Sequence, residues 1–259
     1  MWLELIPAGL ALGAVIIANY TDLKDRIIPN KLTFSLIGFG IVFYLAFGIS
    51  SGEFVRAFYG VIGASIAFGI GYVMWLTGGW AGGDVKLFTA LGALLPAYEA
   101  PYLAPPYSVN YPLFPLTILF NGIIAAIPFL LIYVAVSRAM GRGAFYETVK
   151  ISELKEGMIP AEIIYEKNGK IKRYDSGYFG FLSRAFGTPE WDRQLANPDR
   201  AAGISRYYVG VLRRMVREGK LKDRIKIKKG MPFAPALGAG VFIGIFYGGL
   251  YWGLLTLLA

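Results

Sequence analysis

The sequence predicts an all-α polytopic membrane protein of about six transmembrane helices, with a small α+β cytoplasmic domain inserted before the last helix. The first observation is composition: 56% of the 259 residues are hydrophobic and the mean hydropathy is +0.51, which is too apolar for a soluble globule. The second is a series of apolar runs, most of them close to the ~20 residues that cross a bilayer as a helix. The third is one long polar segment, rich in basic residues, that interrupts these runs shortly before the end of the sequence.

The apolar runs are the predicted spans. The first contains an acid and no basic n-region, so we expect it to stay as a helix and not to be cleaved as a signal peptide. The run that follows Asp84 is shorter than the others, and we expect it to extend to about Ala104. In chain order the runs are Trp2–Thr21, Leu32–Ile49, Phe54–Thr77, Val85–Tyr98, Leu113–Ser137 and Phe233–Ala259.

The polar segment carries the signals of a small folded domain. Two β-like runs flank Asn168-Gly169, a strong hairpin signal. The stretch "SRYYVGVLRRMVREGKL" has apolar residues at helical spacing, with Ser205 as a candidate N-cap and Gly219 near its end. The sequence therefore predicts a membrane domain over 1–137 with five spans, a soluble domain over 138–232 and a last transmembrane helix over 233–259.

Basic residues predict the orientation in the membrane. With six spans, one side of the bilayer receives 25 of the 26 Lys and Arg, and the other side receives only Arg56. Because basic residues mark the cytoplasmic side, we expect the soluble domain in the cytoplasm and both chain ends outside. The net charge of +9 is accounted for in the same way, so the expected partner is the lipid bilayer and not nucleic acid.

Absent residue types limit the chemistry. The sequence has no Cys and no His. This excludes disulfides, thiolate nucleophiles, Ser-His pairs and zinc sites built on His or Cys. No metal and no cofactor are expected, and carboxylates are the strongest catalytic candidates that remain.

The predicted topology places two carboxylates close enough in depth to form a candidate catalytic pair. The first span ends at "NYTDLKDRIIPNKL" and the third at "TGGWAGGDVKLF", and both spans end on the same side of the membrane. Asp22 and Asp84 are therefore expected at similar depth. Two carboxylates within a few ångströms share one proton, so one can activate water while the other donates a proton. Asp25 competes for the role of Asp22, but it lies further from the span.

Two glycines precede Asp84 and are predicted to bind substrate. Gly82 and Gly83 have no Cβ, so an extended peptide could approach their backbone closely. The alternative is structural: Asp84 is the N-cap of the helix that follows, and the glycines form the turn before it. This stretch alone does not decide between the two interpretations.

The sequence also resembles a known family. The stretches "DLKDRIIPN", "GGDVKLF" and "KKGMPFAPALGAGVF", in this order and membrane context, resemble the GxGD-type aspartyl peptidases that process type IV prepilins and archaeal preflagellins. The resemblance implies that Asp22 and Asp84 are the catalytic aspartates, and the long polar segment resembles archaeal members. One position departs from the pattern, because Ala81 replaces the first glycine of GxGD.

The resulting hypothesis is a membrane-embedded aspartyl endopeptidase that cuts the leader from preflagellin or type IV pilin-like precursors at the cytoplasmic border of the membrane. A proton- or ion-coupled transporter or channel is the alternative from another class, since intramembrane carboxylates often couple ions. A non-enzymatic scaffold for pilus assembly is a third. The identity of the precursor and the oligomeric state stay open.

Overall fold

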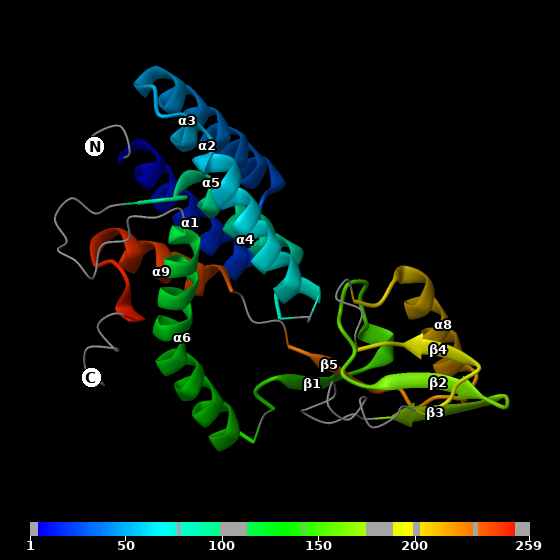
Figure 1. Cartoon of the computed structure of the whole chain (residues 1–259). Coiled ribbons are helices and arrows are strands. Elements are labelled where there is room, and N and C mark those ends of the chain that lie inside the picture. Colours follow the sequence, from blue (N-terminus) through cyan, green and yellow to red (C-terminus); the bar gives the residue numbers. More distant parts are fainter. Residues whose placement is uncertain are drawn as a thin grey trace. The chain divides into compact units, whose positions relative to one another are not determined.

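A computed structural model describes residues 5–76, 79–98, 113–141, 143–174, 189–198, 203–229 and 233–251. The chain divides into two compact units, shown in Figure 1. The helical unit comprises 1–132 and 232–259, and the sheet-bearing unit comprises 133–231.

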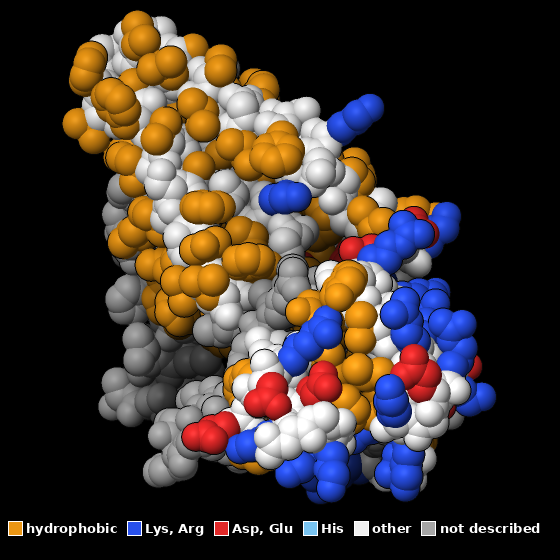
Figure 2. Space-filling view, turned by 90° about the vertical axis from the view of Figure 1, so that its right-hand side faces the viewer, with side chains coloured by type: hydrophobic (Ala, Val, Ile, Leu, Met, Phe, Trp, Pro, Cys, Tyr) orange, Lys and Arg blue, Asp and Glu red, His pale blue; other side chains and the backbone are white. Residues whose placement is uncertain are grey.

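The helical unit is built from apolar helices. They are α1 (Leu5–Asp25), α2 (Asn30–Ser51), α3 (Phe54–Ala57), α4 (Tyr59–Leu76), α5 (Gly82–Leu94), α6 (Phe114–Ala139) and α9 (Ala234–Phe246). Among the described residues, α1, α2, α4 and α6 are long and apolar enough to cross a membrane. Figure 2 shows hydrophobic side chains over much of the visible surface of this unit, as expected where lipid is the solvent.

Two of the predicted spans differ from the helices that the structure contains. The run from Phe54 to Thr77 is divided into the short α3 and the longer α4. The run after Asp84 forms α5, whose 13 residues extend over only about 20 Å. The predicted helix up to Tyr98 is wrong at its end, because α5 ends at Leu94 and residues 95–98 are not helical; its expected extension over 99–104 lies outside the described residues. Four helices are therefore long and apolar enough to be membrane spans, and the count of six stays a prediction.

Helix α5 lies at the centre of the helical unit. All but one of its residues from Asp84 to Leu94 are buried, and it packs against α4 and α2. The close approach of α4 and α5 depends on glycines: a Cβ added to Gly63 would collide with the backbone oxygen of Gly92, and the reverse also holds. This packing holds the first turn of α5, which carries Asp84, against the core.

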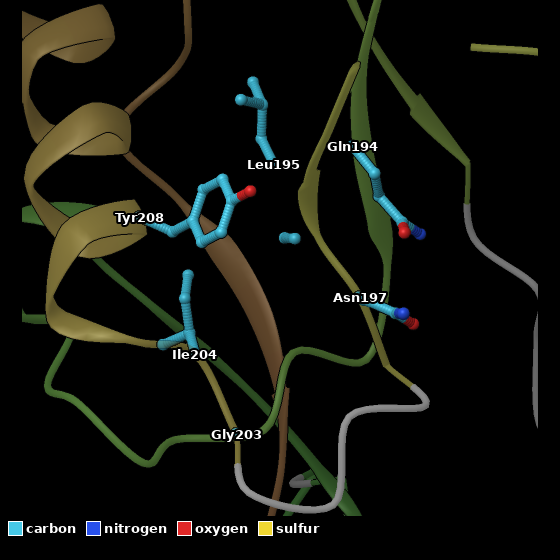
Figure 3. A pocket seen from close by; sticks show the side chains of 7 residues that line it. Gln194, Leu195, Asn197, Gly203, Ile204 and Tyr208 are labelled. Carbon is cyan, nitrogen blue, oxygen red and sulfur yellow. The ribbon is translucent and has the colours of Figure 1, made fainter. Parts of the chain in front are cut away.

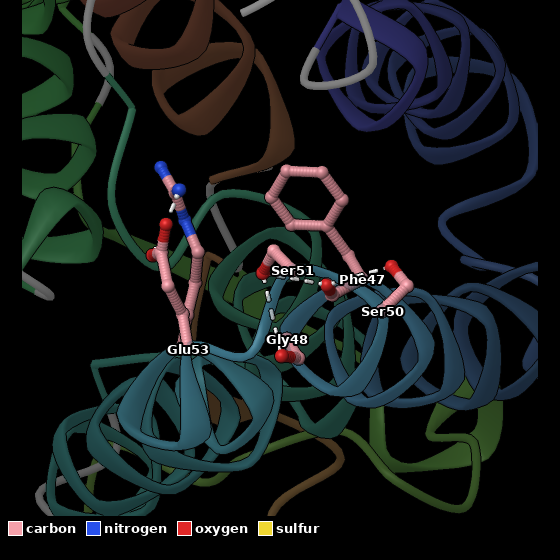
Figure 4. Close-up of polar contacts among 6 residues, drawn as sticks. Phe47, Gly48, Ser50, Ser51 and Glu53 are labelled. Carbon is pink, nitrogen blue, oxygen red and sulfur yellow. Dashed lines mark hydrogen bonds and ion pairs between the residues drawn. The ribbon is translucent and has the colours of Figure 1, made fainter.

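Two helix ends show how polar backbone groups are satisfied. At the end of α2 the hydroxyl of Ser50 donates to the backbone oxygen of Phe47 at 2.9 Å, and Gly52 ends the helix with a φ of 72° (Figure 4). After α9 the chain leaves helical geometry at Gly248, which has a φ of 88°. The side chain of the buried Asn121 of α6 donates a hydrogen bond to the backbone oxygen of Gly248 and accepts one from the backbone N–H of Leu250, each at 2.8 Å. These two bonds satisfy backbone groups that would be paired within the helix if it continued past Gly248.

The sheet-bearing unit confirms the expectation of a small α+β fold. Strands β1 (Tyr146–Val149) and β5 (Ile225–Lys228) form an antiparallel pair. Strands β2 (Ile163–Lys167), β3 (Lys170–Tyr174) and β4 (Arg193–Ala196) form a sheet in the order β3-β2-β4. A 3-10 turn, η1 (Ile151–Glu153), and helix α8 (Arg206–Arg217) pack against one another beside the strands, and Lys and Arg are frequent on the visible surface of this unit (Figure 2).

Local signals in this unit are borne out. The hairpin joins β2 to β3 through Asn168 and Gly169, whose φ values of 53° and 70° match a two-residue turn of type I′. Ser205 occupies the N-cap position of α8, although its side chain makes no capping hydrogen bond.

Candidate active site

Asp22 lies in the last turn of α1, with its carboxyl group directed into the protein. The residue is 8% exposed. Helix α1 packs along α9, and the backbone N–H of Ala234, the first residue of α9, lies near the Asp22 carboxylate and stabilises its negative charge. The Oδ2 atom of Asp22 is buried and has no hydrogen-bond partner among the described residues. One oxygen of this carboxylate is therefore available to another molecule.

Asp84 lies in the first turn of α5 and is 4% exposed. Its Oδ2 accepts a hydrogen bond from the backbone N–H of Ala81 at 3.0 Å. The helix begins at Gly82, so Asp84 is not the N-cap; it satisfies the backbone of the N-cap residue from the third helical position. At Ala81 the backbone is extended, with φ −82° and ψ 159°, so alanine takes the place of the expected glycine without strain.

The two carboxylates are brought together within the helical unit. Asp84 and Asp22 interact electrostatically, and Arg26, just beyond the end of α1, interacts with Asp22. The sequence placed the two acids at similar depth by counting spans, and the structure has them as neighbours. Two buried carboxylates of this kind can exchange a proton with a water molecule and a peptide group.

Asp25 differs from Asp22 in exposure. It is the last residue of α1 and its side chain is exposed, whereas that of Asp22 is buried.

Nearby, Lys86 of α5 donates to the side-chain oxygen of Asn30, the first residue of α2, at 2.8 Å. This hydrogen bond ties the start of α2 to the turn of α5 that carries Asp84.

Gly82 and Gly83 are the first two residues of α5. Neither has a positive φ, so the unusual backbone geometry that glycine permits is not used here. Nothing lies within 4 Å of a Cβ added to Gly82, whereas a Cβ on Gly83 would lie 3.3 Å from Ile28. The backbone at Gly82 is therefore open to an approaching chain, and substrate binding by the two glycines stays a prediction.

Three residues near the aspartates were not anticipated from the sequence. Ala234 acts through its backbone, which leaves no signal in a sequence. Asn19 precedes Asp22 by one turn and its amide lies against Gly238 of α9; a polar amide within an apolar run is a signal that could have been noticed. Trp80 is buried, and its ring lies 4.8 Å from that of Phe233, which directly precedes α9.

The sheet-bearing unit has a small pocket of about 130 Å³ between β4 and α8 (Figure 3). Tyr208 and Leu195 point toward one another across it. Among the described residues that line this pocket there is no carboxylate.

Comparison with known families covers both units. Residues 9–131 match the model of the type IV leader peptidase family, and this range includes both aspartates. Residues 122–227 match the archaeal peptidase A24 C-terminal domain. Both models describe peptidases, and together they span residues 9–227, so the chain is similar to the type IV leader peptidase family over most of its length. It is therefore a peptidase, and neither the transporter nor the scaffold alternative is favoured.

Similar proteins of this peptidase family come from archaea. The prepilin peptidase EppA of Methanothermobacter thermautotrophicus is 27% identical over 371 aligned positions, which cover 96% of each chain. Since 371 positions exceed the 259 residues of this peptidase, EppA contains additional segments. The preflagellin peptidase of Methanococcus voltae is 33% identical over 48% of this chain and 54% of its own length, and that of Methanocaldococcus jannaschii is 34% identical over 44% and 51%.

Proposed function

We propose that this peptidase removes the short leader of preflagellin or type IV pilin-like precursors, with Asp22 and Asp84 as its catalytic pair. The observation that carries the proposal is the pairing of two buried carboxylates, delivered by the ends of two helices. Relatives that are named prepilin peptidase and preflagellin peptidase support the substrate class.

The proposed chemistry is general acid–base hydrolysis. The ionised carboxyl takes a proton from water, and the water oxygen bonds to the carbonyl carbon of the scissile peptide. The protonated carboxyl gives its proton to the carbonyl oxygen; when the C–N bond breaks, the leaving nitrogen accepts a proton from the pair. The pair titrates as a unit, so neither aspartate is assigned as the sole acid or base.

The proposed setting is the cytoplasmic border of the cell membrane. The asymmetric distribution of Lys and Arg supports a cytoplasmic location for the soluble domain, 138–232, and an external location for both chain ends. Six spans, five of them within 1–137 and one over 233–259, would produce this orientation. An extended precursor would then run over the open backbone at Gly82 and the neighbouring Gly83 to reach Asp84.

The test is leader removal in a membrane that contains the full-length peptidase and an archaellin or pilin precursor, followed by gel electrophoresis. Asp22→Asn and Asp84→Asn should each abolish cleavage with unchanged membrane insertion. Asp25→Asn is the matched control because its side chain is exposed at the same helix end, and it should cleave normally. Cleavage that is lost with Asp25→Asn and kept with Asp22→Asn would contradict the site assignment.

A further inference from the structure

Three buried polar atoms around the two aspartates have no hydrogen-bond partner among the described residues. They are Oδ1 of Asn19, Oδ2 of Asp22 and Nε1 of Trp80. A buried polar atom without a partner is costly and uncommon in native proteins, so such atoms require an explanation. The carboxylate oxygen belongs to the proposed reaction. Of the other two atoms, Oδ1 of Asn19 is an acceptor and Nε1 of Trp80 is a donor. A peptide backbone has an N–H group that can donate to the first and a carbonyl group that can accept from the second.

The indole of Trp80 is packed between α5 and the residue that precedes α9. The ring makes an edge contact with Phe88 of α5 at 5.4 Å and a tilted contact with Phe233 at 4.8 Å. Behind the ring, a Cβ on Gly71 would lie 3.3 Å from the indole. Phe233 precedes Ala234, the residue whose backbone N–H lies near Asp22. The indole N–H is therefore fixed in place between the helix that carries Asp84 and the residue before Ala234.

Asn19 lies on the same face of α1 as Asp22, one turn earlier. Its amide nitrogen would lie 2.5 Å from a Cβ on Gly238, so glycine at this position in α9 leaves the room that the amide occupies. Asn19 and Asp22 thus contact successive turns of α9, at Gly238 and Ala234. The acceptor of Asn19 lies one helical turn from the reacting carboxylate.

We propose that Asn19 and Trp80 bind the main chain of the precursor beside the scissile bond. The indole N–H of Trp80 donates to a peptide carbonyl, and Oδ1 of Asn19 accepts from a peptide N–H. This inference rests on the proposed function, because it identifies the part of the precursor that the same site recognises. The ligand is an extended peptide backbone, so the subsite is independent of the side chains around the cleaved bond.

Burial argues against a lipid role for Trp80. Interfacial tryptophans in membrane proteins place the indole at the headgroup level, where its N–H reaches water or lipid. Trp80 is 4% exposed and is enclosed by aromatic rings of α5 and of the residue before α9. A chain that enters the site to reach Asp84 would place backbone groups next to the indole.

The first experiment measures leader removal by full-length protein in liposomes. Trp80→Phe keeps an aromatic ring but removes the donor, and Asn19→Leu keeps the volume but removes the acceptor. Each should lower kcat/KM by roughly 3- to 10-fold, the range expected for one hydrogen bond, and by the same factor for precursors that differ beside the cleavage site. Trp75→Phe, on α4 with its ring stacked on Tyr72, is the matched control and should cleave at the wild-type rate.

A second measurement separates the hydrogen bond from ring packing. The side chain of Trp80 is replaced by its benzothiophene analogue, in which sulfur takes the place of the N–H and the shape is kept. The analogue should lose as much kcat/KM as Trp80→Phe. Wild-type activity of the analogue would show that only packing matters and would overturn the inference.

A third measurement separates this inference from the proposed function. In the Asp84→Asn background, where the substrate is not cut, binding of a labelled precursor peptide is compared with and without Trp80→Phe. Weaker binding supports the backbone subsite. Unchanged binding, together with normal cleavage by Trp80→Phe and Asn19→Leu, overturns the subsite and leaves the peptidase function intact. Absence of cleavage by the wild-type protein would instead refute the proposed function.

Discussion

At the scale of single residues, Asp84 has a structural role besides its proposed catalytic one. Its carboxylate satisfies the backbone N–H of Ala81 and so fixes the start of α5. The structural interpretation considered from the sequence holds in a modified form, because Asp84 stabilises the start of α5 from its third position and is not the N-cap; the functional interpretation stays a prediction. The two roles can be separated because an amide oxygen accepts a hydrogen bond but does not take up a proton at neutral pH.

This separation gives a prediction for two variants of Asp84. Asp84→Asn and Asp84→Ala both remove the charge, but only the asparagine keeps an acceptor for the N–H of Ala81. The alanine variant should therefore have a free energy of unfolding about 1 kcal/mol lower than the asparagine variant. Thermal unfolding in detergent measures the difference. Equal stability of the two variants would show that the hydrogen bond contributes nothing.

At the scale of helices, the position of Asp84 depends on how closely α4 and α5 pack. Gly63 and Gly92 allow the two backbones to meet, whereas Gly69 of α4 has open space around it. A site that needs two carboxylates in contact is sensitive to small displacements of either helix. The glycines along α4 are therefore not equivalent.

The prediction is a contrast between two substitutions in α4. Gly63→Ala should lower the stability by about 1–3 kcal/mol because the added methyl group meets the backbone of Gly92. It should also slow leader removal, since α5 carries Asp84. Gly69→Ala should leave cleavage unchanged and should be as stable as the wild type or up to about 1 kcal/mol more stable, because alanine favours a helix. Equal effects of the two changes would argue against the packing explanation.

The sequence predicts some helices well and others incompletely, for physical reasons. A long apolar run such as that of α2 is set by the thickness of the bilayer, so its length alone identifies it. The short α5 is apolar because it is buried in protein, and its composition resembles that of a lipid-exposed segment. The break after α9 depends on Asn121, a residue of α6, and no pattern within the last apolar run indicates this partner.

The candidate site likewise contains features that the sequence predicts and features that only the structure shows. Asp22 and Asp84 can be predicted as a pair because counting the apolar runs places both of them at the same border of the membrane. The contact of Ala234 with Asp22 is a tertiary contact made by a backbone group, and such contacts do not appear in a single sequence. Asn19 and Trp80 carry polar atoms that can be noticed in the sequence, but only the structure shows that these atoms have no partner among the described residues.

At the scale of the whole molecule, the sheet-bearing unit responds to pH through a group that joins separate parts of its chain. Asp223, just before β5, accepts hydrogen bonds from the backbone N–H and the hydroxyl of Ser152 in η1, each at 3.0 Å. These hydrogen bonds lower the pKa of Asp223 below its ordinary value. A carboxylate with a lowered pKa in the folded state stabilises the fold above its unfolded pKa, and this contribution is lost as the pH falls through the folded pKa.

The corresponding prediction concerns Asp223→Asn in the full-length protein. At pH 7 the variant should unfold at a lower temperature than the wild type, because a charge-assisted hydrogen bond is lost. The difference should shrink below about pH 4, where the wild-type carboxyl itself becomes protonated. Glu190→Gln is the control, since Glu190 is 92% exposed and its ion pair with Lys167 is a surface pair of the kind that contributes little to stability. A difference in unfolding temperature that is constant from pH 7 to pH 3 would contradict this explanation.

The interaction of the Ala234 backbone with Asp22 links α1, the first helix described, to α9. A ribosome delivers α1 to the membrane early and α9 only after the entire sheet-bearing unit has been synthesised. Until then Asp22 lacks this interaction. With Asp22 in its proposed catalytic role, the site would be complete only after α9 has been synthesised and inserted.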